Sequence, residues 1–373
     1  MLDSTTLLEA AADNHRAWFR RLATATGGVI ERGDDVDLVV DGRGHATIAF
    51  PAPGARSRAA LDTLLERAFV LGASSTACWS LDEDDELGVL LLARGFEWGW
   101  QPHWMAIELS ALADDEPGHA VVAVPAEHPS AQRLVVREGE DTVGSVVVLP
   151  RRGIAGIYDM EVVERRRREG IGRALMLAAG RIALELGCSY AVLNATEEGE
   201  QLYTQVGFES LGWGQTWWMH PGPRPTPRQR ELVEAIGSGD LVGLAALDPT
   251  GDELAEPVPG PGVPLAVAAV TEQADVAGWI LDRRPDLVSR AVGGRGATLL
   301  HVAVDRDDEA MVRVALAHDA DLLARDRAYN GTPLDWAEFL GRDDLATVLR
   351  EAAIPSPGAT PDQPGSAEGS GAA

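Results

Sequence analysis

Cysteines are scarce in this 373-residue sequence, and long apolar runs are missing from it. The two cysteines, Cys78 and Cys188, fall in different predicted domains, and they match neither a disulfide framework nor a zinc-binding spacing. No segment reaches the ~18 consecutive apolar residues that a membrane span needs, and the first residues lack the basic start and apolar core of a signal peptide. We therefore expect a soluble protein in the reducing cytoplasm, with no bound metal.

Basic residues are also in the minority. Lysine and arginine together number 32 against 58 aspartates and glutamates, so the formal net charge is −26 at pH 7. Binding to nucleic acids or to anionic membranes needs clustered basic residues on an exposed face, and this balance argues against both. The hydrophobic fraction of 45% is sufficient for substantial cores. The length predicts about two to three domains.

Five of the basic residues gather around two glycines in the middle of the chain. A strand-like run (154–163) leads into this turn, and a strongly periodic helix (174–186) follows it. The arginines are Arg165, Arg166, Arg167, Arg168 and Arg173. The first turn of a helix has backbone N–H groups without partners and the positive end of the helix dipole, and glycines at 170 and 172 let a ligand approach them. A run of charged residues usually lies on a solvent-exposed face. In an acidic protein, however, basic residues around a glycine turn favour a binding site for a pyrophosphate.

The spacing within the turn indicates which cofactor carries that pyrophosphate. The turn lacks the G-x-G-x-x-G of dinucleotide sites and the G-K-[ST] ending of a P-loop. Its Arg-x-x-Gly-x-Gly pattern, from Arg167 to Gly172, resembles the coenzyme A signature of the GNAT superfamily of N-acetyltransferases. A second GNAT-like motif follows, in which a strand (188–194) precedes a helix that bears Leu202-Tyr203 and then Gly207-Phe208. Together the two motifs extend the resemblance over roughly residues 117–220.

The resemblance implies acetyl-coenzyme A as co-substrate and a set of residues that bind it. In the family, the strand before the turn and the next strand splay apart, and the pantetheine arm lies between them against main-chain groups. Thr196 stands where many relatives have an asparagine that touches the coenzyme, and Asn194 lies two residues before it, so the identity of this polar contact stays open. The implied coenzyme-binding residues are Met160, Glu161, Val162, Arg167, Arg168, Glu169, Gly170, Ile171, Gly172, Arg173, Asn194 and Thr196.

Acetyl transfer from a thioester to an amine requires a deprotonated amine, donors for the oxyanion and a proton for the departing thiolate. The resemblance implies that Tyr203 is the general acid that protonates the sulfur, whereas a lone tyrosine would be interpreted as an ordinary buried side chain. The candidates for the base are Asp159 and Glu161, which alternate on one face of the strand 154–163 and can reach the cleft directly or through a water molecule. A solvated or salt-bridged carboxylate beside the arginines is an equally good interpretation of each.

Residues 1–112 resemble residues 113–222. Gly95-Phe96-Glu97 matches Gly207-Phe208-Glu209 at an offset of 112, and a tryptophan-rich segment follows in both places (101–105 and 215–219). Such self-similarity at about 110 residues indicates a duplicated domain. The first copy has Leu91 where the second has Tyr203, and its turn (PAPGARSRA) lacks the coenzyme pattern. We predict that this GNAT-like copy has lost coenzyme binding and acts as a scaffold or as an acceptor-side wall, with its tryptophans in packing or in that wall.

A proline-rich spacer (223–228) separates these copies from a segment with an internal repeat. Leu265, Leu300 and Leu334 recur at intervals of 35 and 34 residues in segments that resemble the helix-opening T-P-L-H-x-A of ankyrin repeats. The resemblance implies a structural, hydrogen-bonded role for His301 and a helix that is capped by Thr332. An ankyrin module usually binds protein, and a short one can also dock on its own chain. The last residues (355–373) have the low complexity of a disordered tail.

These observations predict an α/β (α+β) fold of tandem GNAT domains with mixed central sheets, followed by an all-α ankyrin-repeat solenoid. The predicted parts are a degenerate GNAT-like domain (1–112), a catalytic GNAT domain (113–222), a linker (223–228), ankyrin repeats (229–354) and a disordered tail (355–373). The predicted activity is N-acetyl transfer from acetyl-coenzyme A to a primary amine. Electrostatic steering favours polyamines, aminoglycosides or lysine-rich tails as acceptors, and protein N-termini stay open. The alternative is a non-catalytic acyl-coenzyme A sensor whose ankyrin repeats contact a partner.

Overall fold

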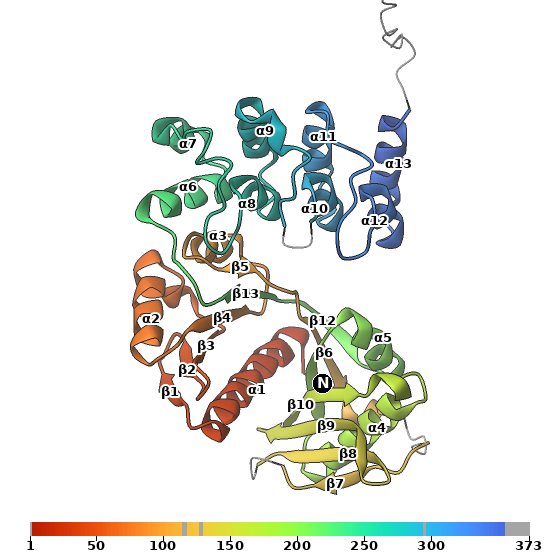
Figure 1. The fold of residues 1–373 in the computed structure, drawn as a ribbon. Helices are drawn as coiled ribbons and strands as arrows, with labels where there is room; N and C mark the ends of the chain where they lie inside the picture. Colours follow the sequence, from red (N-terminus) through yellow and green to blue (C-terminus); the bar gives the residue numbers. More distant parts are fainter. Residues whose placement is uncertain (1, 114–117, 127–129, 294–295, 355–373) are drawn as a thin grey trace, which may run out of the picture. The chain divides into compact units, whose positions relative to one another are not determined.

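The computed structural model describes residues 2–113, 118–126, 130–293 and 296–354, so the predicted tail (355–373) lies outside the described residues. The chain divides into two compact units, Met1–Glu234 with Val258–Pro261, and Ala235–Pro257 with Gly262–Ala373. The first unit contains two sheets and the helices that cover them, and the second is built from helices (Figure 1). Among the described residues, no helix has both the length and the apolar character that a bilayer crossing requires.

Both sheets of the first unit are mixed, as predicted, with one parallel pair of strands in each. In order across the first sheet, the strands are β1 (Val29–Arg32), β2 (Asp37–Val40), β3 (His45–Ala49), β4 (Ser75–Ser80), β13 (Gln215–Met219) and β5 (Glu97–Trp98). Across the second sheet, they are β12 (Glu209–Trp213), β6 (His103–Glu108), β11 (Tyr190–Ala195), β10 (Ile154–Val162), β9 (Asp141–Arg151), β8 (Gln132–Glu138) and β7 (Val122–Val124). The parallel pairs are β3 with β4 and β10 with β11.

The two sequence halves exchange a strand. β6 comes from residues 1–112 but lies between β12 and β11 of the second sheet, whereas β13 comes from residues 113–222 but lies between β4 and β5 of the first. Each exchanged strand carries a tryptophan that is almost fully buried, Trp104 at 1% exposure and Trp217 at 0%. Because each sheet needs a strand from the other half, the two halves complete each other's cores.

Within the described residues, nine helical segments accompany these sheets. They are α1 (Ser4–Ala25), η1 (Pro53–Ala55), α2 (Arg58–Val70), α3 (Asp85–Ala93), η2 (Leu109–Ala111), η3 (Glu164–Arg166), α4 (Ile171–Glu185), α5 (Glu197–Val206) and α6 (Pro227–Gly237). The chain division falls within α6.

The helix α1 is shared by the two sheets. Its apolar face, which includes Leu7 and Ala11, packs in one cluster with Trp79 of the first sheet and Val192 of the second. α4 and α5 cover the opposite face of the second sheet, where Leu175 and Tyr203 belong to a separate cluster. The second sheet therefore has its own helices on one face and a helix from residues 1–112 on the other (Figure 1).

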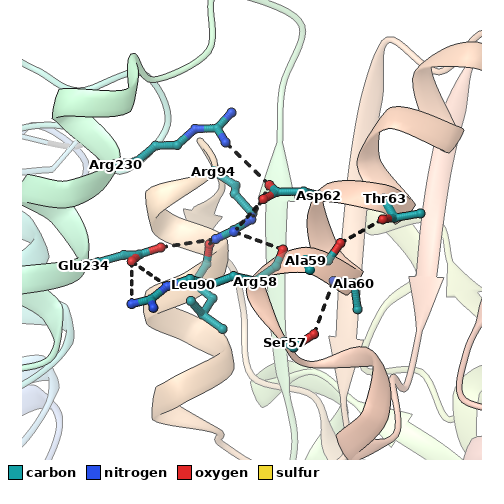
Figure 2. A network of polar contacts seen from close by, with 10 residues as sticks. All are labelled: Ser57, Arg58, Ala59, Ala60, Asp62, Thr63, Leu90, Arg94, Arg230 and Glu234. Atoms are coloured by element: carbon teal, nitrogen blue, oxygen red, sulfur yellow. Dashed lines mark hydrogen bonds and ion pairs between the residues drawn. The ribbon is translucent and has the colours of Figure 1, made fainter.

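A buried arginine joins three helices on the other side of the first sheet (Figure 2). Arg94, which follows α3 and is 3% exposed, donates from Nε and Nη2 to the two carboxylate oxygens of Asp62 in α2, at 2.9 and 3.1 Å. It also donates to the carbonyl oxygens of Leu90 and Arg58, and its Nη1 lies 3.4 Å from Oε1 of Glu234 in α6. Every oxygen in this set loses a donor when Arg94 is removed.

We expect Arg94→Met to lower the free energy of unfolding by about 2 kcal/mol, because it removes a buried guanidinium that donates to Asp62 and to two carbonyl oxygens. Arg58→Met is the matched control, since Arg58 also pairs with Glu234 but its side chain is 70% exposed; there we expect a loss below about 0.5 kcal/mol. Urea unfolding followed by tryptophan fluorescence measures both, because eight of the ten tryptophans lie in the first unit. Equal losses in the two variants would contradict the role of Arg94.

The second unit consists of short helices joined by turns. They are α7 (Leu241–Leu247), α8 (Pro264–Val270), α9 (Ala274–Arg283), η4 (Pro285–Leu287), α10 (Leu299–Asp305), α11 (Glu309–Ala317), α12 (Pro333–Phe339) and α13 (Asp343–Ala352). Polar contacts join residues about one sequence period apart, since Arg306 pairs with Glu272 (34 residues) and Arg342 with Asp307 (35 residues). Successive helix pairs are therefore stabilised by contacts with their neighbours in the sequence.

Two polar residues that the repeat pattern singled out have the structural roles predicted for them. His301 is fully buried; its Nδ1 lies 2.9 Å from Thr298 Oγ1, and its Nε2 lies 3.1 Å from the carbonyl oxygen of Gly331, which it reaches as a donor. The Thr332 hydroxyl accepts from the backbone N–H of Asp335 (3.1 Å), and Pro333 is the first residue of α12. Desolvation lowers the pKa of His301 from its ordinary value, which agrees with a neutral, hydrogen-bonded ring.

Candidate active site

The helix α4 begins without a side-chain cap. Its N-cap is Gly170, whose φ of 84° lies in the left-handed region that favours glycine, and among the described residues no side-chain hydrogen bond caps its start. In α1, α2, α3 and α5 the N-cap side chain accepts a backbone N–H; these caps are Asp3, Ser57, Asp84 and Thr196. The first turn of α4 therefore offers N–H groups and the positive end of its dipole to an anion.

The main chain, not the side chains, is what this turn presents. The side chain of Ile171 is 1% exposed and belongs to the core below the sheet. A Cβ atom on Gly172 would lie 2.9 Å from Cδ2 of Leu202, so glycine allows α4 to approach α5 closely. Glu169 contributes its carbonyl oxygen to His119 Nε2 at 2.7 Å. Contacts from Gly170, Ile171 and Gly172 to a ligand must therefore come from the backbone.

The arginines of the turn separate into two groups. Arg166 is tied to Glu138 (2.6 Å) and Glu169 (2.8 Å), and these carboxylates raise the pKa of its guanidinium. Arg165 lies 3.9 Å from Asp141. These two arginines fit the ordinary interpretation of a salt-bridged surface.

The other three arginines reach toward α5, the helix that bears Tyr203. Nη1 of Arg167 lies 3.8 Å from Oε2 of Glu198, and its Nε donates to the Val162 carbonyl oxygen at 3.3 Å. Nη1 of Arg168 lies 3.5 Å from Oε1 of Gln201, and Arg173 donates to the Gln205 carbonyl oxygen at 3.3 Å. The turn, the end of β10 and α5 are thus brought together.

The strands β10 and β11 part next to this turn. Their parallel pairing covers three positions and ends where Gly156 meets Val192, although β10 continues to Val162 and β11 to Ala195. The edge of β10 that faces β11 is therefore unpaired at Met160, Glu161 and Val162, while its other edge pairs with β9. In the first sheet, by contrast, β3 pairs with β4 along all five of its residues. In the part of the chain that the structure describes, the splay that the resemblance implied is thus found in the second sheet and not between β3 and β4 of the first.

A β-bulge changes the predicted position of Glu161. The pairing of β10 with β9 shifts between Tyr158 and Glu161, and Asp159 adopts a φ of 47°. With this extra residue in the strand, Tyr158 pairs with Val147 and Glu161 with Ser145, so Tyr158 and Glu161 share a face. The expectation that Asp159 and Glu161 lie on one face through regular alternation is therefore wrong. Both carboxylates are exposed, and Asp159 lies 3.7 Å from Nη2 of Arg133.

Tyr203 lies in the middle of α5 with its side chain in the core. It is 8% exposed, its ring is 6.0 Å from that of Phe208, and it packs over Gly199, where a Cβ atom would lie 2.8 Å from its ring. Burial raises the pKa of Tyr203 to about 12. The phenol therefore keeps its proton at neutral pH, which a general acid requires. Its neighbour Leu202 contacts Gly172, so the acid candidate and the turn are parts of one local structure.

The two candidates for the polar coenzyme contact have different environments. The Thr196 hydroxyl accepts from the Gly199 N–H at 3.3 Å and caps α5. Asn194 lies on the face of β11 that α1 covers, two residues after Val192, and its Nδ2 is 3.4 Å from His15 Nδ1. The structure thus already gives Thr196 a structural partner within its own helix.

His15 of α1 was not among the predicted site residues, although it lies beside the parted strands. It is 4% exposed, and its ring centroid lies within 6.0 Å of five aromatic rings, those of Phe19, Phe50, Trp79, Trp104 and Tyr158. Desolvation lowers its pKa to about 3, so the imidazole is neutral. No sequence signal indicated that the helix that bears His15 packs against the second sheet.

A second missed group comes from the exchanged strand β6. His103 is 4% exposed; its Nε2 lies 2.7 Å from Oγ of Ser210, and its Nδ1 lies 3.5 Å from Oε1 of Glu200 on α5. Trp213 stacks on the imidazole with ring centroids 4.2 Å apart. Glu200 precedes Tyr203 by one helical turn, so the first half of the chain places a titratable side chain near the acid candidate.

Comparison with known proteins agrees with this geometry. Residues 129–210 match the family model described as the acetyltransferase (GNAT) domain. This segment therefore matches a GNAT domain. The matched range contains every predicted site residue, from Asp159 to Tyr203.

Several solved structures are similar to the chain at low sequence identity. A GCN5-related N-acetyltransferase from Kribbella flavida is 17% identical, with 57% of this chain and 96% of that chain covered and a TM-score of 0.45. A tandem GNAT protein from the clavulanic acid biosynthesis pathway is 13% identical, with coverages of 58% and 96% and a TM-score of 0.39. A GCN5-related N-acetyltransferase from Sphaerobacter thermophilus is 14% identical, with coverages of 57% and 94% and a TM-score of 0.37. No curated protein matches the sequence.

Proposed function

We propose that this protein is an N-acetyltransferase that moves an acetyl group from acetyl-coenzyme A to a primary amine. The observation that carries the proposal is the uncapped start of α4 at Gly170, beside the point where β10 and β11 part and within the GNAT-matched segment. A helix start without a side-chain cap keeps its donors for an anion, and the parted strands leave main-chain groups for an amide-bearing arm. Both features fit the two chemical halves of coenzyme A.

The residues that hold the co-substrate follow from this arrangement. The backbone amides from Gly170 to Arg173 bind the diphosphate, with the guanidiniums of Arg167 and Arg168 beside them. The free edge of β10, from Met160 to Val162, bonds the pantetheine arm. Asn194 or Thr196 supplies a further polar contact. Acetyl-coenzyme A contributes the activated acetyl group, and the remaining chemistry belongs to side chains of this protein.

Tyr203 acts as the general acid, and a carboxylate acts as the general base. The neutral amine forms a bond to the acetyl carbon, the carbon–sulfur bond breaks, and the Tyr203 hydroxyl gives its proton to the sulfur. Before the attack, Glu161 or Asp159 accepts one proton from the substrate ammonium group. After the attack, the N-protonated amide loses its second proton to the tyrosinate of Tyr203, which restores the phenol. Glu161 shares a face with Tyr158 and is exposed, so it can exchange that proton with water.

Residues 1–112 support the site without binding coenzyme. Three features support this part of the proposal: β3 and β4 stay paired throughout, Ser57 caps α2 with its side chain, and Leu91 stands in the place of Tyr203. The same residues contribute α1 and β6 to the second sheet. We therefore propose that residues 1–112 form one wall of the pocket that binds the amine acceptor.

Residues 229–354 form the interaction module of the proposal. Pairs of short helices with contacts at intervals of 34 and 35 residues, and a Thr-His pair at a helix start, support ankyrin repeats. Such modules bind protein, so their partner is the acceptor itself, a separate protein or another part of this chain. The net charge of −26 favours cationic acceptors, among them polyamines, aminoglycosides, lysine-rich tails and protein N-termini.

Turnover on a panel of amines tests the proposal. We expect acetyl-coenzyme A to bind in titration calorimetry and at least one class of cationic amine to cause release of free thiol, which a thiol reagent detects. Cys78 and Cys188 are buried and contribute little background. Binding without turnover on any amine would favour the alternative, an acyl-coenzyme A sensor. Absence of binding would contradict both.

A further inference from the structure

The helix α1 contacts both of the strands that part beside the coenzyme turn. β10 and β11 are last paired at Gly156 and Val192. Two neighbouring residues of α1, Asn14 and His15, reach past this pair, Asn14 to β10 and His15 to β11. A helix from residues 1–112 therefore meets both sides of the place where the second sheet opens.

The side-chain amide of Asn14 has a partner for each of its hydrogen-bonding groups. It is 1% exposed; its Nδ2 donates to the carbonyl oxygens of Leu149 (3.1 Å) and Ile154 (3.3 Å), and its Oδ1 accepts from the Tyr158 hydroxyl at 2.9 Å. Gly156 leaves room for this amide, since a Cβ atom there would lie 2.2 Å from Oδ1. A flipped amide would bring its oxygen against two carbonyl oxygens, so Asn14 has one orientation.

Tyr158 extends this contact to the free edge of β10. Its ring stacks on that of Trp18 in α1, with centroids 4.3 Å apart and an interplanar angle of 5°. The register of β10 shifts directly after Tyr158, and the unpaired edge at Met160–Val162 follows. α1 thus holds the last regular residue of β10 before the segment that we propose bonds the pantetheine arm.

His15 makes the corresponding contact with β11. Its Nδ1 lies 3.4 Å from Nδ2 of Asn194, two residues beyond the last pair with β10. Past that pair the two strands no longer share ladder hydrogen bonds, so the sheet itself does not fix the distance between them. Packing of both strands against one helix supplies that restraint.

We infer that α1 sets the separation of the parted strands, with Asn14 and His15 as positioning residues for the edge that bonds the pantetheine arm. The inference rests on the proposed function, because it concerns one part of the same co-substrate. Strands that are held apart before binding need not be ordered by the ligand, which lowers the cost of binding. Residues 1–112 thereby raise the affinity for coenzyme without a coenzyme contact of their own.

Two ligands separate this role from general stability. Acetyl-coenzyme A contains the pantetheine arm, whereas adenosine diphosphate carries the diphosphate without the arm. In Asn14→Ala, which loses three hydrogen bonds, titration calorimetry should show a loss of affinity for acetyl-coenzyme A of about ten-fold or more. Tyr158→Phe loses one of these bonds and keeps the ring on Trp18, so we expect a loss of about three-fold. The affinity for adenosine diphosphate should stay within about two-fold in both variants.

Asp13→Asn is the matched control on the same helix. Asp13 adjoins Asn14, but it pairs with Arg151 and Arg152, at the opposite end of the β9–β10 pair from the parted edge. The substitution weakens the hold of α1 on the second sheet without touching the parted strands. We expect the affinities for both ligands to stay within about two-fold of the wild type.

The milder variant, Tyr158→Phe, carries the test if Asn14→Ala does not fold. An unchanged affinity for acetyl-coenzyme A in the folded variants overturns the inference. An equal loss for the two ligands also overturns it, because α1 then stabilises the whole site and not the parted strands, and so does a loss of the same size in Asp13→Asn. A wild type that does not bind acetyl-coenzyme A contradicts the proposed function itself, and the inference with it.

Discussion

Removal of the Tyr203 hydroxyl should abolish most of the turnover and little of the binding. We expect Tyr203→Phe to lower kcat about 100- to 1000-fold, the usual range for loss of a positioned general acid, and to change the affinity for acetyl-coenzyme A less than about three-fold. The reason is that phenylalanine keeps the ring that packs against Phe208 and Gly199 and removes only the proton donor. Steady-state kinetics and titration calorimetry on the same preparation measure the two quantities.

The pH dependence follows from the burial of the same residue. The raised pKa of Tyr203, about 12, means that its active, protonated form persists well above neutral pH. The wild-type kcat/KM should therefore show no loss from this group below about pH 10, whereas an unperturbed tyrosine would begin to deprotonate there. An alkaline loss near pH 9 that vanishes in Tyr203→Phe would contradict the buried position of the hydroxyl.

Tyr190→Phe is the matched control for the loss of a phenol. Tyr190 is also 8% exposed, but it lies at the start of β11, where its hydroxyl accepts from the Leu2 N–H at 3.0 Å. We expect its kcat to stay within about two-fold of the wild type, because the hydroxyl is outside the proposed proton path. Full activity of Tyr203→Phe, or an equal loss in both variants, would exclude Tyr203 as the acid.

The sequence contained enough information for the local elements and for the turn. The predicted helix 174–186 corresponds to α4 (Ile171–Glu185), and the predicted strand 188–194 corresponds to β11 (Tyr190–Ala195). Hydrophobic periodicity and capping residues act within a few residues of each other, so they can be read without knowledge of the fold. The turn between β10 and α4 could be predicted for the same reason, since Arg167, Gly170 and Gly172 lie within six residues.

The partners of these elements could not be predicted in the same way. Residues 92–105 and 204–219 are similar to each other, so β6 and β13 each suit either sheet, and the sequence alone does not indicate their exchange. The position of α1 between the sheets depends on clusters whose members lie more than 100 residues apart, such as Ala11 and Val192. Long-range packing of this kind decides which residues meet at the site, and for that reason His15 and His103 were missed.

The bulge at Asp159 shows that a strand can be predicted correctly while the face on which its side chains lie is predicted wrongly. The predicted strand 154–163 is present as β10 (Ile154–Val162), but its register shifts at Asp159. Aspartate tolerates a positive φ better than most residues, yet it does so in many turns and caps, so its presence in a strand is a weak signal. The two candidate bases are consequently in different environments, and Glu161 faces the side of the sheet that α1 covers.

The first turn of α4 is the part of the site most sensitive to substitution. We expect Gly170→Asp to weaken acetyl-coenzyme A binding about 1000-fold or more, as measured by titration calorimetry. An aspartate at the N-cap can accept the first amides of α4 as Asp3 does in α1, where Oδ1 takes the Thr6 N–H at 2.8 Å. The introduced carboxylate therefore competes for the donors that the diphosphate needs and repels it as well. The loss of two charge-assisted hydrogen bonds, each worth about 1.5 to 3 kcal/mol, accounts for this magnitude.

Gly170→Ala distinguishes competition from distortion of the backbone. Both substitutions place a Cβ atom at a φ of 84°, and among the described residues that atom would meet nothing closer than His119 Nε2 at 4.0 Å. The alanine carries a conformational penalty of about 1 kcal/mol, which is at least as large as that of the aspartate. Only the aspartate adds an acceptor and a charge. The alanine variant should therefore bind acetyl-coenzyme A within about ten-fold of the wild type. Equal losses of affinity in the two variants would show that the left-handed conformation, and not the free amides of α4, is what the ligand requires. An unchanged affinity in Gly170→Asp would place the diphosphate elsewhere and contradict the proposed function at its basis.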